Sequence, residues 1–117
     1  MKVGIDLEEI DRFLDINLEK FCDKYFTEYE KQYALKKGVK TIAGIFSCKE
    51  AVLKAFGIGI GNGVSLKQIS ILHTEKGKPY LEENDTLKKL KMEHNVLECD
   101  ISISHTKHLA QSICILK

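Results

Sequence analysis

The residues best suited to chemistry lie in the middle of the chain, where Glu50 and Lys54 are four positions apart. At this spacing two side chains are neighbours on one face of a helix. The carboxylate can ligate a divalent metal and the lysine can bind a phosphate, since oxygen ligands suit Mg²⁺ and an ammonium is a mobile charge. Lys49 lies about 100° round the same helix from Glu50 and need not share that face. A solvent-exposed Glu–Lys pair has the same spacing, so this pattern alone leaves both interpretations open.

A second carboxylate, Asp6, ends a short apolar run that begins at Val3. Taken alone, it is equally explained as a residue that terminates or caps a strand. Together with Glu50 it would supply the one or two carboxylates that Mg²⁺ usually takes beside substrate phosphates.

Alternating glycines follow the same central helix, at Gly57, Gly59, Gly61 and Gly63. They match neither the phosphate-binding loop that ends in Gly-Lys-Ser/Thr nor the dinucleotide fingerprint, which requires a following helix. The segment is therefore either a flexible connector or a stretch of backbone that approaches a phosphate-rich ligand closely.

His105 and Thr106 close the motif SISHT at 102–106. This motif lacks the Gly-x-Ser-x-Gly elbow of the serine hydrolases. A histidine at the end of a strand is usually a surface residue, but beside the other groups it could bind phosphate or adenine.

Hydrophobic periodicity indicates the elements that must position these residues. It predicts strands at 3–6, 69–72, 80–81 and 101–105, a last strand that follows a turn at 106–108 and ends in 113–116, and helices at 27–38, 41–56 and 85–92. Thr27 and Glu30 have the spacing of a capping box, and Asp85 is the expected cap of the last helix. We therefore expect an α+β fold, with a small antiparallel sheet and a long central helix.

Length and composition narrow the class of protein. The chain has 117 residues, which predicts one domain over 1–117, and a net charge of +1, which predicts no attraction to nucleic acid or membrane. Its N-terminus is not a secretory signal and its apolar runs are too short to span a bilayer, so we expect a cytoplasmic protein. The four cysteines, Cys22, Cys48, Cys99 and Cys114, lack metal-site spacing and are predicted to be reduced and at least half-buried.

Three motifs, taken in order, resemble the holo-(acyl-carrier-protein) synthase family, the small class of 4′-phosphopantetheinyl transferases. They are GIDLEEIDRF at 4–13, FSCKEA at 46–51 continuing to KAFG at 54–57, and SISHT at 102–106. Shorter matches at 63–65 and 77–80 extend the resemblance over nearly the whole chain.

The resemblance implies a homotrimer that binds coenzyme A in clefts between neighbouring subunits. It implies Asp6 and Glu50 as Mg²⁺ ligands and Lys54 as a phosphate contact, and these three as the catalytic residues. Further contacts to coenzyme A would come from Lys49, Gly57, Gly59, His105 and Thr106. Arg12 matches a position that meets the acidic carrier protein.

One position departs from the family pattern. Many members carry arginine just before the phenylalanine of the central motif, where this chain has Ile45. The cationic contact to coenzyme A is then either missing or supplied by Lys40 or Lys49.

The implied activity is transfer of 4′-phosphopantetheine from coenzyme A to a serine of apo acyl carrier protein, with release of 3′,5′-ADP, in support of fatty acid biosynthesis. Glu50 would activate the serine hydroxyl, directly or through a water on the metal. The alternative is a non-enzymatic module that binds a nucleotide or an acidic protein. That alternative explains the mixed charge and the glycines, but not Asp6, Glu50, Lys54 and His105 together.

Overall fold

The computed structural model describes residues 1–59 and 63–117, so Ile60, Gly61 and Asn62 of the glycine segment lie outside the described residues. The elements are β1 (Lys2–Glu9), the 3-10 turn η1 (Ile10–Phe13), α1 (Leu18–Tyr25), α2 (Glu28–Lys37), α3 (Val39–Phe56), the 3-10 turn η2 (Leu66–Gln68), β2 (Ile71–His73), β3 (Pro79–Leu81), α4 (Asp85–Glu93), β4 (Cys99–His105) and β5 (Leu109–Leu116). This is the predicted α+β fold. Within the described residues, no helix is both long enough and apolar enough to cross a membrane.

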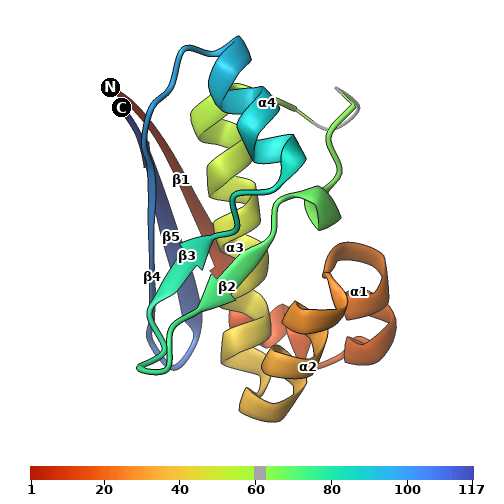
Figure 1. Cartoon of the computed structure of the whole chain (residues 1–117). Coiled ribbons are helices and arrows are strands. Elements are labelled where there is room, and N and C mark those ends of the chain that lie inside the picture. Colours follow the sequence, from red (N-terminus) through yellow and green to blue (C-terminus); the bar gives the residue numbers. More distant parts are fainter. Residues whose placement is uncertain (60–62) are drawn as a thin grey trace.

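The main sheet has three antiparallel strands in the order β1-β5-β4. Residues 2 and 116 pair at one end of β1 and residues 9 and 109 at the other, so the two chain termini lie side by side (Figure 1). Strands β2 and β3 form a separate antiparallel pair. Because successive residues of a strand point to opposite faces, Asp6 and Glu8 face the same side of the sheet.

Helix α3 runs along that inner face and occupies the centre of the molecule (Figure 1). The first strand approaches it so closely that a Cβ atom at Gly4 would lie 2.0 Å from the backbone oxygen of Ala51 and 2.4 Å from the amide nitrogen of Ala55. Only glycine allows this approach. Gly57 ends the helix in a left-handed conformation, with φ of 71°. Asp6, two residues after Gly4, is thereby held beside the last turns of α3.

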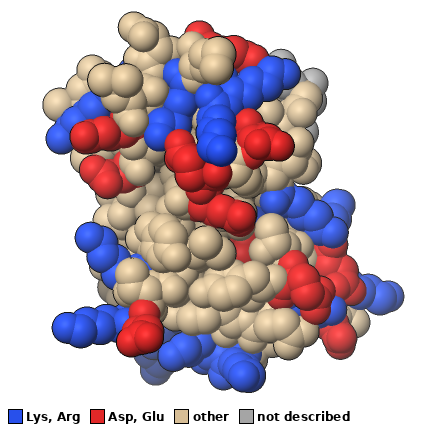
Figure 2. All heavy atoms as spheres, in the orientation of Figure 1, with Lys and Arg blue, Asp and Glu red and all other residues tan. Residues whose placement is uncertain are grey.

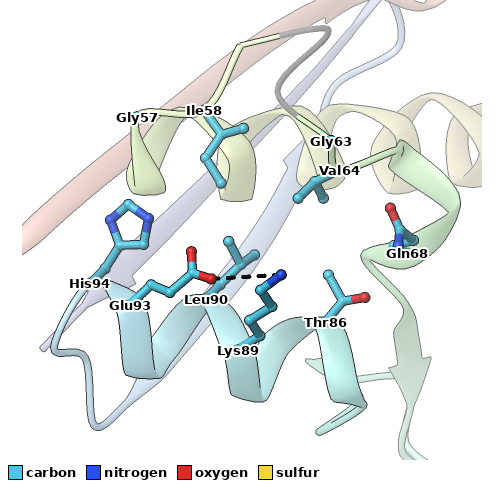
Figure 3. Close-up of a pocket in the computed structure, with 10 residues that line it drawn as sticks. All are labelled: Gly57, Ile58, Gly63, Val64, Gln68, Thr86, Lys89, Leu90, Glu93 and His94. Atoms are coloured by element: carbon cyan, nitrogen blue, oxygen red, sulfur yellow. Dashed lines mark ion pairs between the residues drawn. The ribbon is translucent and has the colours of Figure 1, made fainter.

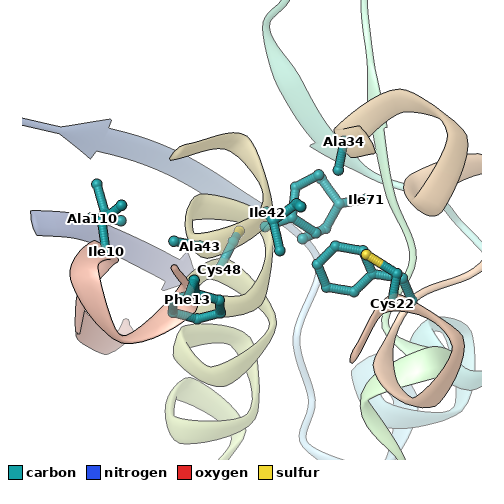
Figure 4. Packing of buried hydrophobic residues seen from close by; sticks show 11 residues of the cluster. Ile10, Phe13, Cys22, Ala34, Ile42, Ala43, Cys48, Ile71 and Ala110 are labelled. Atoms are coloured by element: carbon teal, nitrogen blue, oxygen red, sulfur yellow. The ribbon is translucent and has the colours of Figure 1, made fainter. Parts of the chain in front are cut away.

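Apolar side chains pack on several sides of α3. Figure 4 shows one cluster, in which helix residues such as Ile42 and Cys48 lie among side chains from η1, α1, α2, β2 and β5. A second cluster surrounds the C-terminal half of α3 and includes residues of α4 and β5. All four cysteines are free, three of them buried and Cys99 half-buried, which confirms the prediction.

The outer face of the sheet is apolar and exposed. Val3, Ile5 and Leu7 of β1 have exposed fractions of 60%, 52% and 58%. Ile115 and Ile113 of β5 pair with Val3 and Ile5 and extend the row across the next strand. In the single chain, this face therefore presents apolar side chains to solvent.

Several local predictions are confirmed. Thr27 and Glu30 form the capping box, and the helix that they begin ends before Gly38. Other boundaries were wrong. The first strand does not end at Asp6 but continues to Glu9 along the edge of β5, and Asn84 caps α4 in place of Asp85 because its side chain accepts the Leu87 amide hydrogen.

The short helix α1 was not predicted. Asn17 caps it, and its side chain accepts the amide hydrogen of Lys20. Eight residues give little periodicity to detect, so its position depends on tertiary packing, in which Phe21 contacts Phe13 and Phe46.

Candidate functional site

Asp6 is the centre of the candidate site. Its position in β1 buries the side chain against α3, where 6% of the residue remains exposed. Its Oδ1 atom accepts a hydrogen bond from Lys54 Nζ at 3.0 Å. Its Oδ2 atom is buried and has no hydrogen-bond partner. A buried carboxylate oxygen without a partner is costly in a protein of this size, so this atom marks a place where a cationic ligand would be favourable.

Glu50 and Lys54 lie one helical turn apart on α3, as their spacing predicted. Burial raises the pKa of Glu50, and the negative charge of Asp6 raises it further, while Lys54 opposes the shift. The two carboxylates are therefore close enough to repel each other. The Lys54 side chain is 55% exposed and its ammonium lies between the buried Asp6 and solvent. The structure thus brings Asp6, Glu50 and Lys54 together.

This donor set fits Mg²⁺. The available atoms are carboxylate oxygens, one of them a buried oxygen without a partner, and two such carboxylates are what Mg²⁺ commonly takes when phosphates and waters complete its shell. Among residues 1–59 and 63–117, no three His, Cys, Asp or Glu side chains are placed to hold a metal by themselves. A cation at Asp6 and Glu50 would therefore depend on oxygen atoms of a ligand for the rest of its coordination.

A third carboxylate, Glu8, lies beside this pair and was missed in the sequence. Burial raises its pKa to about 7, helped by the adjacent Asp6 carboxylate and by the charge of Glu50. Arg12 Nη2 donates to Glu8 Oε1 at 3.3 Å and opposes the shift. Strand alternation continued past Asp6 would have placed Glu8 on the same face. The predicted carrier-binding residue Arg12 is thus connected to the carboxylates through Glu8.

The placement of Lys49 argues against its predicted contact with coenzyme A. Its side chain is fully buried, and its ammonium donates to Glu30 Oε1 at 2.6 Å and to the backbone oxygens of Leu66 and Ile69, both at 2.9 Å. These three bonds use all three ammonium protons. Lys49 therefore has no ammonium hydrogen left to donate to a phosphate of coenzyme A.

Glu50 lines a groove of about 700 Å³ between α1 and the segment after the glycines. The other residues that line this groove present mostly apolar surface. They are Lys24, Tyr25, Phe46, Leu53, Gly63, Val64, Ser65, Leu66 and Gln68. A long, mostly uncharged ligand could therefore lie in this groove with one end at the Glu50 carboxylate.

A second cavity, of about 380 Å³, lies between α4 and the described glycines Gly57 and Gly63 (Figure 3). Lys89 and Glu93 of α4 line it opposite Val64 and form an ion pair at 3.8 Å. Val64 also lines the groove beside Glu50, so its segment separates the two spaces.

His105 lies apart from the carboxylates, at the end of β4. It lines a third pocket of about 210 Å³ together with Lys40, Ile45, Tyr33 and His73. The rings of Tyr33 and His73 stack with centroids 3.9 Å apart and planes within 9° of parallel. Ile45 is buried here, so the departure from the family pattern leaves an apolar wall, and Lys40 is the cationic residue that lines this pocket. Thr106 follows His105, and its backbone amide bonds the Leu109 oxygen.

Helix α3 separates His105 from Glu50. Thr41 lines the His105 pocket, while Glu50 lies nine residues later and therefore about 180° round the helix. In one chain the two pockets thus open on opposite faces of α3.

Known proteins share this arrangement of sequence and structure. Residues 2–114 match the family model described as the 4′-phosphopantetheinyl transferase superfamily. The chain belongs to that superfamily. The holo-[acyl-carrier-protein] synthase of Caldanaerobacter subterraneus subsp. tengcongensis is 40% identical, over 97% of this chain and 91% of that protein. The resemblance to the holo-(acyl-carrier-protein) synthase family is confirmed at this level.

Two solved structures of this superfamily have the same fold. The Helicobacter pylori holo-[acyl-carrier-protein] synthase in complex with coenzyme A superposes with a TM-score of 0.84 at 27% identity, covering 98% of this chain and 99% of that one. The Bacillus anthracis holo-(acyl-carrier-protein) synthase in complex with CoA (3′,5′-ADP) gives a TM-score of 0.80 at 34% identity, covering 98% and 94%. The predicted 4′-phosphopantetheinyl transferase fold is therefore confirmed.

Proposed function

We propose that this chain is a Mg²⁺-dependent holo-(acyl-carrier-protein) synthase, which transfers 4′-phosphopantetheine from coenzyme A to a serine of apo acyl carrier protein and releases 3′,5′-ADP. The observation that carries the proposal is the buried, unpartnered Oδ2 of Asp6 beside Glu50 and Lys54. The names of the matched synthases and the coenzyme A in the Helicobacter pylori structure support the choice of substrates.

In the proposed reaction the carrier serine oxygen attacks the phosphorus joined to pantetheine. The new bond is Ser O–P, and the bond that breaks joins this phosphorus to the oxygen that leaves with 3′,5′-ADP. Asp6 and Glu50 would hold Mg²⁺, which supplies positive charge at the phosphate oxygens. Glu50 would accept the serine proton, directly or through a water. The exposed ammonium of Lys54 contacts the phosphates and stabilises charge on the leaving oxygen.

The nucleotide end of coenzyme A would lie in the His105 pocket. Lys40 supplies the cation there in place of the arginine that Ile45 replaces, and His105 and Thr106 contribute polar groups. Figure 2 shows basic side chains along the lower edge of the molecule, where α2 ends, and the last turn of α2 carries Lys36 and Lys37. Such a group of charges favours a phosphate-rich ligand. Backbone contacts from Gly57 and Gly59 remain part of the proposal.

A homotrimer would bring the two pockets to one ligand. Glu50 and the His105 pocket lie on opposite faces of α3. A single coenzyme A molecule therefore contacts both sites most simply when a neighbouring subunit supplies one of them. The exposed row formed by Val3, Ile5 and Leu7 supports association through the sheet. Arg12 is exposed and would meet the acidic carrier protein.

The chain would act as one domain over 1–117, in the cytoplasm and in fatty acid biosynthesis, without nucleic acid or membrane partners. Four free thiols fit a reducing compartment. A net charge of +1 gives no general attraction to polyanions.

The decisive experiment mixes the chain with coenzyme A, Mg²⁺ and an apo acyl carrier protein, and then weighs the carrier. We expect a mass gain of one phosphopantetheine, and at least about a hundredfold slower gain with Glu50→Gln, because that variant loses both a ligand and a proton acceptor. Glu98→Gln, an exposed residue that lines none of the three cavities, is the matched control and should be unaffected.

Two results would contradict the proposal. Near-normal turnover by a folded Glu50→Gln variant would remove Glu50 from the chemistry, and equal rates with and without a chelator would exclude dependence on a metal. Coenzyme A binding without any gain in carrier mass would favour the non-enzymatic module.

A further inference from the structure

Residues 63–69, here called the pocket wall, separate two cavities. Val64 and Gln68 line both the groove of about 700 Å³ that contains Glu50 and the cavity of about 380 Å³ between α4 and the described glycines Gly57 and Gly63 (Figure 3). The size of the groove at Glu50 therefore depends on where the wall lies.

The wall has few apolar anchors of its own. Residues 63–68 are exposed or half-exposed, and only Ile69 at its end is buried. Buried apolar contacts are what usually fix a segment of this length, and weakly packed segments open easily. Val64 and Leu66 pack against the second apolar cluster but stay half-exposed, so hydrogen bonds from other elements add to the attachment of the wall.

Lys49 supplies the buried part of that attachment. Its ammonium donates to the backbone oxygens of Leu66 and Ile69, at two points of the wall, and its third bond goes to Glu30. Glu30 in turn accepts the amide hydrogens of Thr27 and Ile71, both at 2.7 Å. One fully buried ion pair thus connects α2, α3, the wall and β2.

On the solvent side the wall has a weaker attachment. Asn84 Nδ2 donates to the backbone oxygen of Gln68 at 3.0 Å, while its Oδ1 caps α4. Asn84 lines neither cavity, so it can be changed without removing a lining group.

We infer that Lys49, with Glu30, is a positioning residue that holds the pocket wall at the spacing at which the Glu50 groove fits the phosphopantetheine arm of coenzyme A. This inference rests on the proposed function. The arm is long, uncharged along most of its length and carries two amides, which suits the apolar Leu53, Val64 and Leu66 beside the polar Ser65 and Gln68.

The test compares coenzyme A with 3′,5′-ADP, which lacks the arm, by titration calorimetry on the full chain without carrier protein. The variant Lys49→Met/Glu30→Gln leaves no unpaired buried charge. We expect it to bind coenzyme A about tenfold more weakly and 3′,5′-ADP within about twofold of the parent chain. Amide hydrogen exchange in 65–69 should become faster. Lys67→Met, an exposed lysine of the same wall, should change neither affinity.

A second variant keeps the test informative if the double variant does not fold. Asn84→Asp retains the helix cap and loses the donor to Gln68, so coenzyme A should bind about threefold more weakly and 3′,5′-ADP unchanged. Equal weakening of both ligands, or of neither, would overturn the positioning role. The measurement needs no turnover, so its failure is distinguishable from failure of the transfer reaction, which carrier mass reports.

Discussion

Helix α3 carries two lysines that each form an ion pair with a carboxylate from another element, and the two pairs differ in burial and in hydrogen bonding. Lys49 bonds Glu30 at 2.6 Å with both side chains fully buried, whereas Lys54 bonds Asp6 at 3.0 Å with the lysine 55% exposed. In the first pair the ammonium has three acceptors; in the second, Asp6 retains a buried oxygen without a partner. The Lys49–Glu30 pair, whose ammonium hydrogens all have acceptors, stabilises the fold. The Lys54–Asp6 pair, which keeps a buried oxygen without a hydrogen bond, is suited to binding a ligand.

The difference follows from what surrounds each lysine. The two lysines are five positions apart on one helix, so they point about 140° apart. Lys49 faces α2 and the pocket wall, where burial lowers its pKa and the Glu30 carboxylate opposes that shift. Lys54 lies in the last turn of the helix beside β1, where its charged end reaches solvent. A buried pair is costly to break, while an exposed one contributes little to stability.

The largest expected effect comes from breaking the buried pair. Glu30→Ala removes the acceptor of Lys49 and of two backbone amides, so it should lower the free energy of unfolding by about 3–5 kcal/mol. Urea unfolding followed by circular dichroism measures this. Glu28→Ala, an exposed residue of the same helical turn that bonds only Gln32, is the control and should cost less than about 0.5 kcal/mol. A loss below about 1 kcal/mol in Glu30→Ala would erase the contrast between the two pairs.

The exposed pair should show the opposite behaviour. Lys54→Ala should lower the transfer rate constant about 10- to 100-fold while lowering the free energy of unfolding by less than Glu30→Ala does, about 1–2 kcal/mol. The reason is that its ammonium would bind developing charge on the phosphate, whereas in the folded chain its loss removes only the single partner of the buried Asp6 carboxylate. Single-turnover kinetics with carrier mass as the readout measures the rate. Lys89→Ala on α4 removes another exposed lysine–carboxylate pair and should leave the rate unchanged; an equal loss there would show a nonspecific charge effect.

The parts of the site that could be predicted are those whose interacting residues lie close together in the sequence. Glu50 and Lys54 are four residues apart on a strongly periodic helix, so their shared face could be read locally. The capping role of Glu30 was equally local. Its second role was not, because it depends on Lys49 and Ile71, 19 and 41 positions away. The pattern alone therefore could not show that Lys49 is the buried lysine.

The helices and strands likewise were predictable where their signal is local in the sequence. Long α3 and the alternating β4 were predictable, while α1 was missed because eight residues carry little periodic signal. Ending the first strand at Asp6 also hid Glu8, since the pairing of β1 with β5 that extends the strand joins opposite ends of the chain. Tertiary pairing of this kind leaves no local trace in the sequence.

The smallest effect concerns Glu8, which extends the exposed pair into a group of carboxylates. Its pKa rises from the ordinary 4.5 to about 7 by burial and by Asp6, against the charge of Arg12. The folded chain therefore holds a proton that the unfolded chain loses above about pH 4.5. This contribution to stability is complete below pH 4.5 and falls as the pH rises through about 7. In a chelating buffer, Glu8→Gln should gain about 1 kcal/mol relative to the parent between pH 5 and 8, given partial screening.

Urea midpoints measured across that range test the sign as well as the size. Glu9→Gln, the next residue on the solvent-facing side of β1, is the matched control and should show no comparable trend. A relative stability of Glu8→Gln that stays flat, or falls, between pH 5 and 8 would mean that the pKa of Glu8 is not raised in the folded chain. Lys54 and Asp6 would then form an ion pair that is not influenced by a neighbouring Glu8 carboxylate. A rising difference would instead show that burial and the neighbouring Asp6 together disfavour the ionised Glu8 in the folded chain, a cost that a bound cation would relieve.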